Sequence, residues 1–346
     1  LLTAARVLSA IRQGPGLLCA QARSASQSEL PGLRRRLEAW LASLSRLQID
    51  PERATAAATR VADAIFTRCV ELARADLGPP PAPYAVLAVG SQGRQELLPG
   101  SDQDNALIYP DGADGAWFEA FASDCIARYH AAGWPRCHGG CHAGNPRWCR
   151  SLSAWQEQYR GWINTAEPQA LLEATVFFDA RLVEGEAQFV GALVDSTLQA
   201  IAQRPVFLVQ LAQESLQARS PLGLFGGIRP DDERLGTTDL KMAMLHATSF
   251  ARIQALSQGL WIPGTGARLR RLAQGQHLPG DLVDDALAAW RHLLGLRLVQ
   301  RSRPGGGDQI DPAALASWDR SLLKRALNTM ESLRERLRSD LSRVGA

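Results

Sequence analysis

The pattern of apolar positions predicts helices at the beginning of the chain. Between residues 33 and 47, apolar side chains recur about every 3.6 residues, as they do on one face of a helix. A second helix is predicted over residues 51–75, because Asp50 followed by Pro51 is a typical helix start. Four prolines in the five positions 79–83 then end the helical region, since proline cannot continue a helix.

Shorter apolar runs in the centre of the chain predict a small sheet. Residues 84–89 and 105–109 fit buried strands, and residues 115–132 fit an amphipathic helix. Residues 134–148, rich in glycine, cysteine and histidine, are expected to form a loop. The apolar run at 174–178 is too short for its periodicity to separate strand from helix.

From about residue 193 onward the pattern predicts helices and no strands. The expected helices are separated by proline and glycine breaks and span 193–218, 239–259, 281–301 and 312–343. The predicted organisation is therefore a helical arm at 1–80, a small α/β domain at 81–192 and a helical bundle at 193–346.

Composition excludes several classes of protein. A chain of 346 residues is too long for one simple core and is expected to form two or three domains. Its net charge of +3 is too small to indicate a DNA partner, and no apolar run is long enough to span a membrane. Six cysteines in a chain of this length do not indicate a secreted disulfide scaffold, so we expect a bacterial, cytoplasmic protein.

A glycine-rich turn follows the first predicted strand. Gly90 frees backbone N–H groups to face an anion, and Ser91 adds a hydroxyl donor. Gly93 keeps the turn open, and Arg94 can pair with a phosphate through two hydrogen bonds. The turn is therefore a candidate phosphate site, and an ordinary turn is the alternative interpretation.

Two carboxylates stand at the start of the second predicted strand. On an extended chain, Asp102 and Asp104 project from one face, with Cα atoms roughly 6–7 Å apart. Carboxylates at this spacing can share Mg²⁺ ions, which keep places for phosphate oxygens. A helix cap or Asx-turn is the alternative, but the order of strand, Gly-Ser turn, Asp-x-Asp and strand favours a metal-dependent nucleotide site.

The loop segment from Cys137 to His142 contains two cysteines and two histidines, which are the side chains that zinc favours. No second, distant pair of such residues completes a tetrahedral set. We therefore interpret this segment as loop packing near the active site.

Further segments extend the pattern downstream: Gly133–Gly140, Asn145–Trp148, Phe177–Gly185, Pro221–Gly227 and Asp239–Lys241. Together with Gly90–Glu96 and Ser101–Asp104, they resemble the polymerase-β-type nucleotidyltransferase superfamily. Within it, the chain is most similar to the branch that contains the protein-PII uridylyltransferase N-terminal domain and the nucleotidyltransferases called DUF294. The resemblance implies an α+β fold, in which a small mixed-sheet polymerase-β-like domain is flanked by an N-terminal helical arm and a C-terminal all-α bundle.

The resemblance also implies roles for single residues. Asp102 and Asp104 would be catalytic and bind Mg²⁺ or Mn²⁺, and the nucleoside triphosphate would be held by Gly90, Ser91, Gly93 and Arg94. Such sites usually have a third carboxylate, for which Asp179 is the candidate; the alternative is that it pairs with an arginine and is structural.

Two basic residues carry open alternatives. Arg94 either touches the nucleotide or forms a structural ion pair with Glu96 behind the site. Lys241, one of only two lysines, either reaches a phosphate or is a solvated lysine at a helix start.

The expected activity is transfer of UMP, or of AMP, from a nucleoside triphosphate to a hydroxyl acceptor with release of pyrophosphate. By resemblance, the helical bundle would present the acceptor, a regulatory protein of PII type, which would place the chain in signal transduction. Members of this branch often carry cyclic-nucleotide-binding and CBS modules upstream, and none is recognised here. The alternative is a non-catalytic nucleotide-sensing or interaction module that retained the fold.

Overall fold

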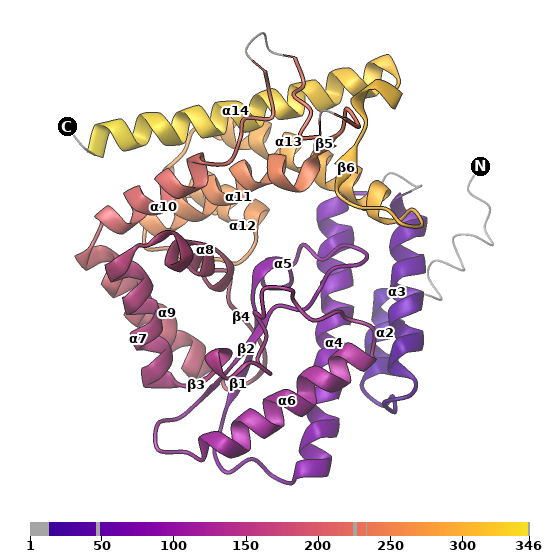
Figure 1. Cartoon of the computed structure of the whole chain (residues 1–346), viewed down its shortest axis with the longest axis vertical. Helices are drawn as coiled ribbons and strands as arrows, with labels where there is room; N and C mark the ends of the chain where they lie inside the picture. The colour runs from indigo at the N-terminus through magenta and orange to yellow at the C-terminus, as the bar shows by residue number, and fades with distance from the viewer. Residues whose placement is uncertain (1–13, 46–48, 224–226, 233, 345–346) are drawn as a thin grey trace. The chain divides into compact units, whose positions relative to one another are not determined.

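The computed structural model describes residues 14–45, 49–223, 227–232 and 234–344. Its contacts divide the chain into two units, whose elements are labelled in Figure 1. The first unit holds the residues up to Ile49, Arg53–Tyr159 and Val176–Ser196, and the second holds Asp50–Glu52, Arg160–Thr175 and the residues from Thr197 onward. The domain boundaries predicted at residues 80 and 192 stay predictions, and residues 1–13 of the predicted arm lie outside the described part.

Helices precede the sheet, as the apolar periodicity predicts. α2 (Pro15–Ala22) packs against α3 (Leu30–Ser45), which buries the leucine stripe expected from the sequence. In α4 (Pro51–Leu77), the side-chain oxygen of Asp50 accepts a hydrogen bond from the Glu52 N–H at 3.0 Å. This bond satisfies one of the N–H groups that a helix start leaves unpaired, so Asp50 caps α4 as predicted.

A four-stranded mixed sheet lies at the centre of the first unit. Its strands are β1 (Ala85–Ala88), β2 (Asn105–Tyr109), β3 (Cys149–Ser151) and β4 (Arg181–Gly185), in the order β3-β2-β1-β4. β1 runs antiparallel to β2 and β4, whereas β2 and β3 are parallel. Because Ala88 pairs with Asn105, the end of β1 lies beside the start of β2.

One helix of the first unit packs against the sheet, and a helix divided between the two units contains most of the apolar run at 174–178. α6 (Gly115–Ala131) packs against β2 and β3, and Phe118 stacks on Tyr109 with ring centroids 4.7 Å apart. The apolar run at 174–178 proves helical, since α8 (Pro168–Phe177) includes most of it. The sheet with its helices confirms the predicted α+β fold.

In the part of the second unit that the structure describes, most residues are helical and two short strands form a ladder. Its helices are α10 (Val206–Leu216), α11 (Leu240–Ser257), α12 (Thr265–Gln274), α13 (Gly280–Arg301) and α14 (Ser317–Val344). The ladder pairs β5 (Thr238–Asp239) with β6 (Gln309–Ile310), so the expectation of no strand after residue 193 is wrong. Strands of two residues are too short to show an alternating pattern.

A single helix over 193–218 is also a wrong prediction. α9 (Ala187–Gln203) ends before Pro205, and α10 begins after it, because proline lacks the N–H that a continuous helix needs. α7 (Leu152–Thr165), α8 and α9 each begin in one unit and end in the other. None of the helices in the described ranges is long and apolar enough to cross a membrane.

Candidate active site

The turn after β1 lies against one of the predicted metal ligands. α5 (Gly90–Gly93) is a single helical turn that starts with Gly90 in the left-handed region, at a φ of 56°. A Cβ atom on Gly90 would lie 2.7 Å from a side-chain oxygen of Asp104. Glycine is therefore required here twice, for the backbone conformation and for the space that the Asp104 carboxylate occupies.

The residues around Asp102 and Asp104 alternate between two faces. Both aspartates are half-buried, whereas Gln103 and Asn105 are completely buried. This alternation is the period of two that an extended chain imposes on its side chains. One face of the segment therefore carries two carboxylates, and the other carries two amides.

The two amides hold the loop at 134–143. Gln103 donates from its backbone N–H to the Pro135 carbonyl at 2.9 Å and from its side chain to the Trp134 carbonyl at 3.0 Å. The Asn105 side-chain oxygen accepts from the Ala143 N–H at 2.8 Å. The loop is thereby attached at both ends to the segment that bears the carboxylates.

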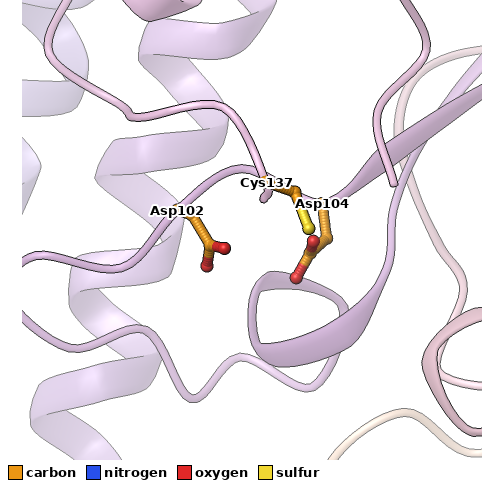
Figure 2. Close-up of side chains that lie close together, drawn as sticks. All are labelled: Asp102, Asp104 and Cys137. Carbon is orange, nitrogen blue, oxygen red and sulfur yellow. The ribbon is translucent and has the colours of Figure 1, made fainter. Parts of the chain in front are cut away.

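Cys137 lies in this loop and completes a cluster with the carboxylates. One ligand atom each from Asp102, Asp104 and Cys137 lies within 4.8 Å of the other two, and Figure 2 shows the three side chains converging. Sequence reasoning missed Cys137 because its contact with the aspartates depends on hydrogen bonds that the spacing of residues does not reveal. The alternating amides beside the aspartates were the available signal.

The electrostatics of the cluster favour a cation. The pKa of the Asp104 carboxyl is raised to about 9, first by burial and then by the neighbouring Cys137 thiol and Asp102 carboxylate. Burial beside a second carboxylate makes Asp104 costly to ionise, and a bound cation lowers that cost. Two carboxylates and a thiol form a donor set that can hold a divalent metal ion.

Asp179 is engaged elsewhere. Its fully buried side chain accepts a hydrogen bond from the Arg94 guanidinium at 2.6 Å. Arg94 also donates to Glu96 at 2.8 Å, the ion pair that the sequence raised as an alternative. Asp179 is not a member of the three-residue cluster around Asp102.

The glycine turn is held from behind by a second set of contacts. Arg181 of β4 pairs with Asp63 of α4 at 2.8 Å and donates to the Gln92 carbonyl at 3.1 Å. The Gln92 side chain donates to the same Asp63 at 2.9 Å. Asp63 and Gln92 were not predicted, and together with Arg181 they tie α5 to both β4 and α4.

The remaining predicted residues lie at the surface or in the other unit. Ser91 in α5 is half-exposed, so its hydroxyl can reach a ligand. Lys241 is exposed in the first turn of α11, in the second unit, and its part in nucleotide binding stays a prediction. Of the motif Pro221–Gly227, residues 224–226 lie outside the described ranges.

Two family models match the chain. The model described as "Putative nucleotidyltransferase DUF294" matches residues 35–169, which include the glycine turn, both aspartates and Cys137. The model described as "Putative nucleotidyltransferase substrate binding domain" matches residues 205–341, which include the helices α10, α11, α12 and α13 of the second unit. None of the curated proteins compared with the chain matches it.

Proposed function

Because the chain belongs to the DUF294 nucleotidyltransferase family, we propose that it transfers a nucleoside monophosphate from a nucleoside triphosphate to a hydroxyl acceptor. Pyrophosphate is the other product. The observation that carries this proposal is that Asp102 and Asp104 converge beside the Gly90 turn. All three residues lie in the region matched by the DUF294 family model. Such a transfer requires carboxylates that bind a metal ion next to a turn whose N–H groups can face phosphates.

Each part of the site has a task in this reaction. Asp102 and Asp104 hold a divalent cation, Mg²⁺ or Mn²⁺, which when bound neutralises phosphate charge. The turn of Gly90 and Ser91 offers backbone N–H groups and a hydroxyl to the phosphates. Gly93 allows the turn to lie close to the sheet, so that these donors are already in position before substrate arrives.

Arg94 and Asp179 take positioning roles in our proposal. The Arg94 guanidinium is held by two carboxylates, and this supports a structural role over direct phosphate binding. Asp179 acts through Arg94, which follows directly after the glycine turn.

The acceptor and the nucleotide rest on family resemblance. The second unit contains the region that matches a substrate-binding model, which supports placing the acceptor there. We propose a regulatory protein of PII type as the acceptor and UTP as the donor, with ATP as the variant to be tested beside it. Lys241 is proposed to contact a phosphate.

Label transfer tests the proposal. The protein is incubated with Mg²⁺ or Mn²⁺, each α-labelled triphosphate in turn, and cell extract as a source of acceptor. Wild type is expected to label an acceptor, and Asp102→Asn/Asp104→Asn to lose about 10²-fold or more of that rate, because charge stabilisation at the phosphate is removed. Glu119→Gln, an exposed acid on α6, is the matched control and should keep the wild-type rate.

Two outcomes would contradict the proposal. Label transfer that is absent for every triphosphate, or equal in wild type and the double variant, excludes transfer at this site. Triphosphate binding without transfer would instead support a nucleotide-sensing module.

A further inference from the structure

We propose that Cys137 is the third protein ligand of the metal site and that its sulfur makes the site select a transition metal ion over Mg²⁺. This inference rests on the proposed function only for the existence of a metal at Asp102 and Asp104.

The position of Cys137 is fixed by the fold. Its ligand atom lies within 4.8 Å of those of Asp102 and Asp104, and Figure 2 shows the sulfur beside the Asp104 carboxylate. The loop that carries Cys137 is held by Gln103 and Asn105, which alternate with the two aspartates. The thiol is therefore presented by the same segment that presents the carboxylates.

No carboxylate competes for this place among the described residues. Asp102, Asp104 and Cys137 form the only group of three or more such side chains that the described part of the chain brings together. Asp179, the carboxylate expected from family resemblance, accepts its hydrogen bond from Arg94. The side chain that joins Asp102 and Asp104 is thus the Cys137 thiol and not the Asp179 carboxylate.

A sulfur ligand changes which ions are favoured. Mg²⁺ prefers oxygen ligands, whereas thiolates favour softer ions such as Co²⁺ and Zn²⁺. Binding replaces the S–H bond of Cys137 by a sulfur–metal bond, and the proton leaves to the buffer. The oxidation states of sulfur and metal do not change, so no oxidant or reductant takes part.

Co²⁺ is a direct probe, because a cobalt–thiolate bond gives a charge-transfer absorption in the near ultraviolet. The whole chain is titrated with Co²⁺ under a reducing, oxygen-free atmosphere, without nucleotide. Wild type is expected to show the band, and its intensity at saturation should correspond to one thiolate ligand for each bound Co²⁺. Cys137→Ser and Cys137→Ala should both lose it, and Cys19→Ser, which removes a half-buried thiol on α2, should keep it.

Competition with Mg²⁺ measures the preference. Excess Mg²⁺ should displace Co²⁺ poorly from wild type, and Cys137→Ser should weaken Co²⁺ binding by about 10- to 100-fold or more while changing Mg²⁺ binding little. Thermal unfolding of each variant confirms that it is folded. The proposal is overturned if the band never appears, if it persists in folded Cys137→Ser and Cys137→Ala, or if Cys19→Ser abolishes it.

These outcomes are independent of label transfer. A cobalt–thiolate band in a chain that transfers no nucleotide would keep the ligand and contradict the proposed function. Label transfer that depends on Asp102 and Asp104, without the band, would keep the function and refute Cys137 as a ligand.

Discussion

Replacing Gly93 with alanine should separate the glycine turn from the sheet. A Cβ atom at this position would lie 2.9 Å from the Ala88 carbonyl oxygen and closer still to that of Asp179. Both neighbours are backbone atoms, so neither can rotate away as a side chain could. Relief of the overlap requires α5 to move by about 1 Å or more, since non-bonded heavy atoms settle at roughly 3.5–4.0 Å.

The expected costs follow from this displacement. Forcing a methyl group into a packed position typically lowers the free energy of unfolding by about 1–3 kcal/mol. Activity should fall further, by about 10²-fold, because a shift near 1 Å at a reacting centre has that effect. The turn that moves carries Ser91 and also Gly90, which lies against Asp104.

Gly191→Ala is the matched control. Gly191 lies exposed within α9, and a Cβ atom there would meet nothing within 4 Å. Alanine in that helix should stabilise the protein by roughly 0.5–1 kcal/mol and leave label transfer unchanged. Denaturant unfolding and label transfer, measured on both variants, compare the two positions. A Gly93→Ala protein with wild-type stability and rate would refute the close packing of the turn.

Two further predictions concern stability. Arg94→Met removes an ion pair of the buried Asp179 and should lower the free energy of unfolding by about 3–5 kcal/mol. Arg94→Met/Asp179→Leu should restore part of that loss, and denaturant melts in which the double variant is no more stable than the single one would contradict this. Burial raises the pKa of the Asp308 carboxyl, but hydrogen bonds from Arg301 and Arg297 outweigh burial and hold that pKa below its usual value. Because the folded pKa is lowered, the stabilisation is present above the unfolded pKa of about 3.9 and is lost as the pH falls through the folded pKa. The Tm of Asp308→Asn should lie below that of wild type at pH 7, and this difference in Tm should shrink below about pH 4. A difference in Tm that stays constant from pH 7 to pH 3 would show that the charge of Asp308 is not responsible for the stabilisation.

The sequence predicts those parts of the fold that have a long or sharply bounded pattern. The stripes of α3 and α4 and the buried runs of β1 and β2 are found where periodicity places them. β3 is three residues long and β4 is partly exposed, so neither shows an apolar run or a clean alternation. Both strands are defined by pairing with distant partners, which local pattern does not encode.

The same distinction between local pattern and distant partners applies to the residues of the candidate site. The turn at Gly90 and the aspartates are close in sequence, and the pairing of β1 with β2 brings them together as their order suggests. Cys137 and Asp179 are distant from that segment, and hydrogen bonds of Gln103 and Arg94 decide where each one lies. Those bonds depend on the completed fold, so residue types and spacing alone place the two side chains poorly.

The attachment of the 134–143 loop sets a rule for building chimeras between members of this family. A loop transplanted alone would meet a host segment whose amides were fitted to a different loop. Gln103 and Asn105 must therefore be transferred together with residues 134–143, although some thirty residues separate the two segments in the sequence. A library that recombines the two segments independently would consist mostly of clones whose aspartates are intact and whose thiol is out of place.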